Sequence, residues 1–155
     1  MEENCSLVRA KIRPFEPTDF SAIEAIYALS KLDELRFETS SFELLPLKQD
    51  TQRLQGLMAS RIFVYDDSGI QGYGAVFGSE IRAVFVHPMH RGKGLGKRLL
   101  EHLLLQTGGG ARLFVAKSNK PAVALYQRYG FEVTREFGAS YNGKPVVANE
   151  MVLQG

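Results

Sequence analysis

Residues 81–107 combine an apolar strand pattern, a glycine-containing loop and an amphipathic helix pattern, and they constrain the fold of this chain most. The strand pattern is centred on Val84, Phe85 and Val86, and the loop glycines are Gly92, Gly94 and Gly96. Glycine lets the backbone turn its N–H groups inward without a Cβ clash. The helix that follows presents unpaired N–H groups and the positive end of its dipole. A strand, a glycine loop and a helix in this order predict a phosphate-binding cradle.

Positive charge is concentrated around the same loop. The basic side chains are Arg91, Lys93, Lys97 and Arg98. The formal net charge of the whole chain is only +2, so no strong field for nucleic acid or an anionic membrane is expected. Local positive charge beside a helix N-terminus instead predicts a polyphosphate ligand, most simply a pyrophosphate.

Two familiar nucleotide-binding loops do not match the spacing of these glycines. The P-loop needs Gly, four residues, Gly, Lys and then Ser or Thr; here the interval from Gly92 to Gly96 is one residue too short, and Arg98 stands at the Ser/Thr position. The dinucleotide fingerprint Gly-x-Gly-x-x-Gly fails because the third glycine is misplaced. ATPase and NAD-binding interpretations are therefore disfavoured.

A third pattern fits, and it occurs with a second motif. Arg91-x-x-Gly94-x-Gly96 resembles the pyrophosphate-binding loop (Gln/Arg-x-x-Gly-x-Gly/Ala) of the GNAT acyltransferases, which bind acetyl-CoA. Downstream, the strand, Asn, Ala-x-x-x-Tyr helix and Gly-Phe of that family are matched by Asn119, Ala122, Tyr126, Gly130 and Phe131. The two motifs stand in the right order, and together they cover about residues 80–135. On these residues the chain is identified as a member of the family.

The resemblance implies an α/β (α+β) GNAT fold with a central mixed, mostly antiparallel sheet, a splayed parallel pair and flanking helices, as one domain over 1–155. Hydrophobic periodicity predicts the elements independently. Strands are expected at 7–13, 61–65, 70–77, 80–86, 111–116, 131–137 and 146–153. Helices are expected at 19–29, capped by Thr18, at 50–58, within 92–107 and at 120–129, with a mobile connection over 30–49.

The resemblance also implies how the cofactor is held, with the pantetheine arm lying between the splayed strands like a further strand. The implied cofactor-binding residues are Val84, Phe85, Val86, Arg91, Gly92, Lys93, Gly94, Leu95, Gly96, Lys97, Asn119, Ala122 and Tyr126. Two alternatives stay open. Lys93 and Lys97 either face the pyrophosphate or are solvated loop charges. Asn119 hydrogen-bonds the pantetheine, caps the helix at 120–129, or does both.

Catalysis is expected to need a base for the amine and an acid for the departing thiolate. Tyr126 matches the family tyrosine whose hydroxyl approaches the CoA sulfur; the alternative is a packed core tyrosine. Glu80, at the start of the strand 80–86, stands where the histone-acetylating branch places its glutamate base; the alternative is an exposed strand-end glutamate. His87 precedes Pro88 and is a weaker candidate for the base.

The acceptor is expected to contact residues 30–49, the hairpin near Tyr73 and a late loop over 138–145. Acidic side chains in the first segment are Asp33, Glu34, Glu38 and Glu43. They either attract an ammonium group or form a solvated polar face.

Cysteine and histidine usage argues against a disulfide or a metal site. Cys5 is the only cysteine, and His87, His90 and His102 lack the companions that a metal site needs. The N-terminus shows no secretory signal pattern and no apolar run reaches membrane-spanning length, so a cytoplasmic protein is expected.

The leading hypothesis is an acetyl-CoA-dependent N-acetyltransferase that acts on a primary amine of a small molecule or of a protein or peptide, without a metal. Two alternatives are a non-catalytic acyl-CoA-binding sensor or scaffold and a toxin that acetylates aminoacyl-tRNA. The toxin would need a broad basic face outside the cofactor loop, which the sequence lacks. No nucleic-acid or membrane partner is expected, and the protein is expected to be a monomer or a homodimer.

Overall fold

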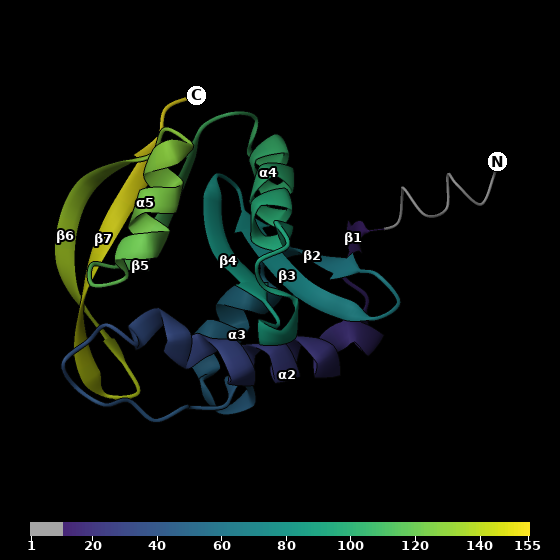
Figure 1. The fold of residues 1–155 in the computed structure, drawn as a ribbon, viewed down its shortest axis with the longest axis horizontal. Coiled ribbons are helices and arrows are strands. Elements are labelled where there is room, and N and C mark those ends of the chain that lie inside the picture. The colour runs from purple at the N-terminus through teal and green to yellow at the C-terminus, as the bar shows by residue number, and fades with distance from the viewer. Residues whose placement is uncertain (1–10) are drawn as a thin grey trace.

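The computed structural model describes residues 11–155, and its strands form one mixed sheet (Figure 1). The sheet order is β1-β2-β3-β4-β5-β7-β6. The strands are β1 (Ile12–Pro14), β2 (Arg61–Asp66), β3 (Ile70–Phe77), β4 (Glu80–Val86), β5 (Ala111–Ala116), β6 (Glu132–Tyr141) and β7 (Lys144–Leu153). Each neighbouring pair is antiparallel except β4–β5. This arrangement confirms the predicted fold class.

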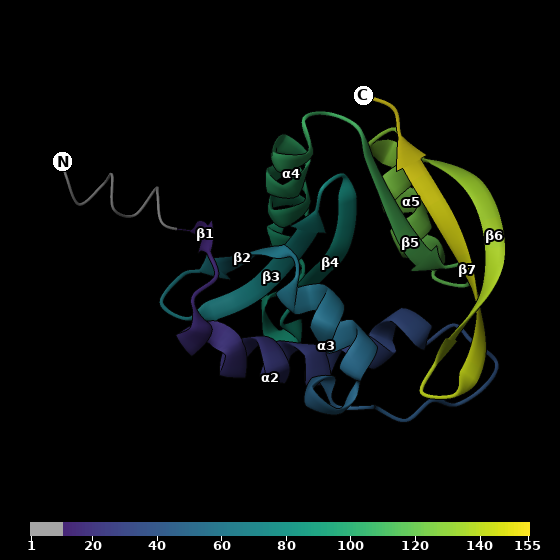
Figure 2. The ribbon, with the colours of Figure 1, turned by 180° about the vertical axis from the view of Figure 1, so that it is seen from behind.

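Helices cover both faces of the sheet. They are α2 (Phe20–Ser30), α3 (Thr51–Met58), α4 (Leu95–Thr107) and α5 (Lys120–Arg128), with short 3-10 turns η1 (Pro17–Asp19), η2 (Lys31–Leu35), η3 (Leu47–Gln49) and η4 (Pro88–His90). α4 and α5 lie in front of the sheet in Figure 1, and α3 is in front in the reverse view of Figure 2. α2 shares the α3 face, because Ile23 and Tyr27 pack with Tyr73 and Phe85. None of the helices in residues 11–155 is long and apolar enough to cross a membrane.

The parallel strands β4 and β5 pair at one end and then diverge. Their register contains a single pair, Glu80 with Arg112. On the other side of β4, the His87 N–H donates to the Gln71 carbonyl at 2.8 Å. Because backbone groups alternate along a strand, the N–H and C=O groups of Val84 and Val86 point away from β3. β4 therefore carries a backbone edge that faces the gap.

The helix α4 packs closely on β3 because two strand residues are glycines. A Cβ placed on Gly72 would lie 3.2 Å from Leu99 Cδ1, and one on Gly74 would lie 2.9 Å from Leu103 Cδ1. Leu99 and Leu103 of α4 are fully buried as a result. This close approach fixes the helix that begins at the glycine loop.

The last two strands are longer than predicted, and the loop expected at 138–145 is wrong. β6 continues to Tyr141 and β7 begins at Lys144, with Tyr141 paired to Lys144. The two-residue turn consists of Asn142 (φ 49°) and Gly143 (φ 80°). Positive φ at both positions matches the twist of a tight hairpin, so the ladder extends to the turn.

The start of α2 also differs from its prediction. Thr18 does not cap the helix, because a 3-10 turn over Pro17–Asp19 precedes it. The Asp19 carboxylate accepts instead from the Glu16 N–H at 2.8 Å and from Arg13 at 2.9 and 3.0 Å. The strand predicted at 7–13 appears as Ile12–Pro14, and its first residues lie outside the described ones.

The connection over 36–46, predicted as mobile, is tied to the tip of the β6–β7 hairpin. The Tyr141 hydroxyl accepts from the Leu45 N–H at 2.8 Å. The Asn142 amide donates to the Glu43 carbonyl at 3.0 Å, and Lys144 donates to the Ser41 carbonyl. These bonds hold the segment against the tip of the hairpin.

Candidate active site

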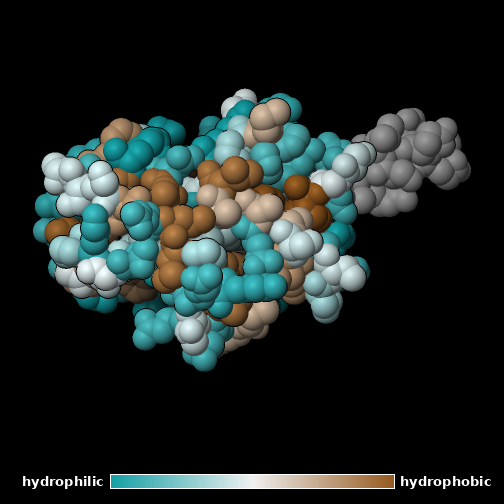
Figure 3. All heavy atoms as spheres, turned by 90° about the horizontal axis from the view of Figure 1, so that it is seen from below, coloured by the Kyte–Doolittle hydropathy of each residue, from teal (hydrophilic) through white to brown (hydrophobic). Residues whose placement is uncertain are grey.

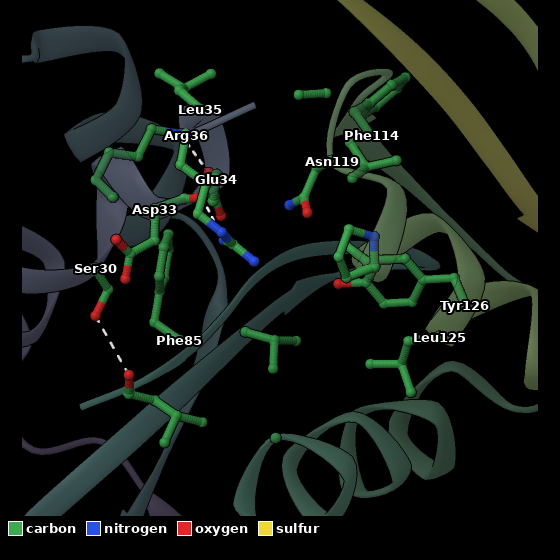
Figure 4. Close-up of a pocket in the computed structure, with 18 of the residues that line it drawn as sticks. Ser30, Asp33, Glu34, Leu35, Arg36, Phe85, Phe114, Asn119, Leu125 and Tyr126 are labelled. Carbon is green, nitrogen blue, oxygen red and sulfur yellow. Dashed lines mark hydrogen bonds and ion pairs between the residues drawn. The ribbon is translucent and has the colours of Figure 1, made fainter. Parts of the chain in front are cut away.

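A cavity of about 1010 Å³ occupies the gap between β4 and β5 and continues to the N-terminus of α4. Its walls come from η2, β4, the loop before α4, β5, α5 and the β6–β7 hairpin. Figure 4 shows Glu34 of η2 on one side of this cavity and Asn119 and Tyr126 on the other. The sheet thus opens where two parallel strands separate, which is the site that the sequence predicts.

The glycine loop adopts the backbone that a phosphate cradle requires. Gly92 and Gly94 have φ of 81° and 83°, a region that favours glycine, and Gly94 immediately precedes the first residue of α4. A Cβ on Gly94 would meet nothing within 4 Å, so the space beside the helix N-terminus is open. The helix begins at Leu95, within the range 92–107 predicted for loop and helix, because the positive-φ glycines belong to the loop.

The predicted cofactor-binding residues come together around this one cavity, and all of them except Lys93 line it. Lys97 lies at the cavity, whereas Arg98 donates to the Tyr65 hydroxyl at 2.7 Å. Of the basic side chains around the loop, Arg91 and Lys97 are the ones that line the cavity.

Two side chains form hydrogen bonds to the backbone at the end of the open edge of β4. The Val86 carbonyl accepts from the Ser30 hydroxyl and from Arg91 Nε, both at 3.3 Å. Arg91 also forms an ion pair with Asp33. These contacts connect the end of α2, η2 and the glycine loop, and they fix the wall of the cavity near Val86.

Asn119 stands at the start of α5 with its side chain in the cavity (Figure 4). The residue is 8% exposed, and its side chain makes no capping hydrogen bond to α5. The capping alternative is therefore not what the structure shows. The carboxamide is available to a ligand between the strands.

Tyr126 lies on α5 with its hydroxyl directed into the cavity (Figure 4). Its ring packs edge-on against Phe131, with centroids 5.8 Å apart. Burial, and secondarily the negative charge of Glu34, raise the pKa of Tyr126 to about 12. The phenol is thus held protonated at the cavity, as a proton donor would need to be.

Glu80 does not join this group. Its carboxylate is paired with Arg82 at 3.3 Å and Arg112 at 3.6 Å, at the closed end of the strand gap. It lines neither this cavity nor a smaller one described below. Its role as a base stays a prediction, and would need a chain of water molecules to reach the gap.

Four further side chains line the cavity: Ser30, Lys31, Glu34 and Arg53, from the end of α2, from η2 and from α3. The first three lie within the segment 30–49 that was expected to contact the acceptor, whereas Arg53 was not predicted. Three carboxylates of this segment are engaged: Asp33 with Arg91, Glu34 with Lys31, and Glu38 with Ser118. In the described part of the chain, no three His, Cys, Asp or Glu side chains are grouped to hold a metal ion.

Comparison with known proteins agrees with this geometry. A family model described as an acetyltransferase (GNAT) domain matches residues 59–133. The peptidyl-lysine N-acetyltransferase YjaB of Salmonella typhimurium is 34% identical over 84 residues, which are 54% of this chain and 57% of that enzyme. The spermine/spermidine N(1)-acetyltransferase of Bacillus subtilis is 33% identical over 72 residues, 43% of this chain and 46% of the relative.

The fold itself is shared with solved structures. The structure of yncA from Salmonella typhimurium with its cofactor acetyl-CoA superposes with a TM-score of 0.67 and 23% identity, covering 92% of each chain. The chain spans less than two thirds of the length of the curated relatives named above, so their acceptors are not transferred with the fold. Residues 59–133 of this chain thus match a GNAT acetyltransferase domain, and the strand order and the glycine loop agree with that match.

Proposed function

We propose that this protein is an acetyl-CoA-dependent N-acetyltransferase that moves an acetyl group directly to a primary amine. One observation carries the proposal. The cavity between the diverging strands joins the open backbone edge of β4, the cradle before α4 and the buried Tyr126 hydroxyl. A linear ligand with a pyrophosphate at one end and a reactive thioester at the other matches that order of groups.

The residues present fit acetyl-CoA. Gly92, Gly94 and the N–H groups that begin α4 would hold the pyrophosphate, with Lys97 beside them. The N–H and C=O groups of Val84 and the N–H of Val86, with the Asn119 carboxamide, would hold the pantetheine amides. When bound, acetyl-CoA supplies an acetyl group activated as a thioester.

The proton donor that we propose is Tyr126, which would deliver its phenolic proton to the departing sulfur. Its raised pKa keeps that proton in place at neutral pH. Backbone N–H groups at the gap, with Val86 foremost, would stabilise negative charge on the carbonyl oxygen. Glu80 stays the predicted base, acting through water.

The acceptor class is a primary amine of a small molecule or of a protein or peptide. The named relatives support both, since one acetylates peptidyl lysine and the other polyamines. No observation favours a non-catalytic sensor, because Tyr126 is present and faces the cavity. We further propose one GNAT domain over 1–155, a cytoplasmic location, and a monomer or homodimer.

The first test measures acetyl-CoA binding by calorimetry and CoA-thiol release across a panel of polyamines, aminoglycosides, amino acids and Lys- or N-terminal peptides. We expect binding, and turnover with one acceptor class. Gly94→Asp is expected to abolish binding, because it places a side chain and a negative charge in the cradle.

Gly78→Asp is the matched control for that variant. Gly78 also has a positive φ, 60°, and open space around an added Cβ, but it lies in the β3–β4 turn away from the cavity. The control should bind acetyl-CoA normally. A wild-type protein that does not bind acetyl-CoA, or a Gly94→Asp variant that binds it normally, would contradict the proposal.

A further inference from the structure

A second cavity of about 300 Å³ adjoins the first on the α2/α3 face of β4. The two cavities share wall residues, which are Lys31, Glu34, Arg53, Phe85 and Phe114. The deeper wall of the second cavity comes from α2, α3, β3 and β4. The second cavity thus meets the first from the opposite face of the sheet, across the gap between β4 and β5.

Aromatic rings form much of its wall. Tyr27 packs edge-on against Phe85 with ring centroids 5.7 Å apart, and Tyr73 lies 5.5 Å from the same ring. The Tyr27 hydroxyl is buried and has no hydrogen-bond partner among residues 11–155. A buried hydroxyl without a partner is unfavourable, so this wall offers an unused hydrogen-bonding group next to an apolar surface.

Charged side chains surround the aromatic wall, and cations outnumber carboxylates. Lys31, Arg53 and Arg82 line the second cavity, with Glu34 as its one carboxylate within the described chain. The carboxylates that pair with the arginines, Asp50 with Arg53 and Glu80 with Arg82, do not line it.

Glu34 stands at the junction of the two cavities. It lines both, and its carboxylate lies 2.9 Å from Lys31 Nζ. Burial is the main cause of the raised pKa of Tyr126 in the first cavity and of Tyr73 in the second, and the negative charge of Glu34 adds to both, after that of Tyr27 for Tyr73. In the view from below, hydrophobic residues gather in the middle of the surface with hydrophilic ones around and across them (Figure 3).

We propose that the second cavity is the acceptor site and that it takes a small primary amine that also carries a carboxylate and an apolar body, as a free amino acid does. Glu34 would hold the ammonium group near the gap, and the cations led by Arg82 would hold the carboxylate. The aromatic wall would hold the apolar body. The inference rests on the proposed acetyltransferase function. The volume lies at the small end of ligand sites, about 300 to 1,000 Å³, which favours a free small molecule over a peptide.

The test compares amines that differ only in the carboxylate: L-phenylalanine with phenethylamine, and L-methionine with 3-(methylthio)propylamine. With acetyl-CoA saturating, we expect kcat/KM to favour the carboxylated member of each pair at least tenfold. Calorimetric titration of the same amines into the enzyme–CoA complex gives a readout that does not need turnover. Glu34→Gln is expected to raise KM for all four amines.

Arg82→Gln and Arg112→Gln form a matched pair of variants. Both remove an ion pair with Glu80, but only Arg82 lines the second cavity. We expect Arg82→Gln to bring the preference for the carboxylated amine close to unity, and Arg112→Gln to leave it unchanged.

The outcomes separate this inference from the proposed function. Equal rates and equal binding within each pair, no binding of any of the four amines, or equal effects of the two arginine variants would overturn the acceptor assignment. Turnover with a polyamine or a Lys peptide in that case keeps the acetyltransferase function. Loss of acetyl-CoA binding by the wild-type protein would instead remove both.

Discussion

At the residue scale, Tyr126 is the side chain on which the proposed chemistry depends most. Desolvation at the cavity disfavours the phenolate, and Glu34 adds to the effect, so the pKa rises to about 12. A phenol with that pKa stays protonated through the physiological range, so its proton is available to a departing thiolate, whose basicity desolvation in the same site also raises.

We predict that Tyr126→Phe lowers kcat at least tenfold with little change in acetyl-CoA affinity, because the ring and its packing against Phe131 are kept. The shape of the kcat–pH profile between pH 6 and 10 should not change, because a group with a pKa near 12 does not titrate there. An unchanged kcat would remove Tyr126 from the acid role. Tyr129→Phe is the control, since its hydroxyl bonds to Glu101 and does not line the cavity.

The sequence was informative about backbone-held residues and less so about isolated charged ones. Gly94 and Val86 could be predicted because their expected roles depend on the backbone alone. The glycine spacing indicates the loop, and the apolar run indicates the strand. The surroundings of Glu80 could not be predicted, because Arg112, 32 positions further along the chain, reaches it only when β4 and β5 pair. Glu34 was seen only as one of several acidic residues, since its place between two cavities depends on how η2 packs.

At the element scale, the position of α4 depends on missing side chains in β3. Gly72 and Gly74 let the helix approach the strand within van der Waals contact. The same contact fixes the N-terminus of α4, which forms the cradle. A change in the strand should therefore affect stability first and cofactor affinity second.

We predict that Gly74→Ala lowers the free energy of unfolding by about 1–3 kcal/mol, because its Cβ would meet Leu103 Cδ1 at 2.9 Å. Gly138→Ala in β6 is the control: its Cβ would meet nothing within 4 Å, and it should be neutral or slightly stabilising. Denaturant unfolding of both variants measures the difference. Equal stabilities would show that α4 can move away from β3 at little cost.

Elements with strong local signals were predicted closely, and elements set by tertiary contacts were not. Hydrophobic alternation and turn residues located β3, β4 and β5, and three glycines marked the end of α4. The start of α2 was misplaced because Asp19 is held by Arg13 from β1, a contact that no local cap pattern records. The connection 30–49 was expected to be mobile because its composition is mixed, whereas the hydrogen bonds of its part 36–46 run to residues about a hundred positions away, which no local pattern records.

At the scale of the whole molecule, the contact of Arg13 with Asp19 and Asp66 joins β1, α2 and β2. Hydrogen bonds from Arg13 lower the pKa of Asp19 despite its burial. A carboxyl with a lowered folded-state pKa stabilises the fold above its unfolded pKa of about 3.8. That contribution is lost as the pH falls through the folded-state pKa, because the unfolded chain takes up the proton first.

We predict that Asp19→Asn lowers the free energy of unfolding by roughly 1–3 kcal/mol at pH 7, and that the difference from the wild type shrinks as the pH falls below about 4. Urea unfolding at a series of pH values measures both effects. Asp67→Asn is the control, because the Asp67 side chain is 45% exposed. A difference that stays constant down to the acid limit would contradict the role assigned to the Asp19 charge.

The single register pair between β4 and β5 has a consequence for how the molecule resists unfolding. β5, β7 and β6 meet the other strands through one rung of backbone, and side-chain packing around α4 and α5 supplies the rest. A ligand that pairs with both open edges would act as the absent strand of the sheet. Its binding energy would then add to the cohesion of the two half-sheets, by an amount that grows with ligand concentration. The folded protein would therefore persist longer when its ligand is abundant than when the ligand is scarce.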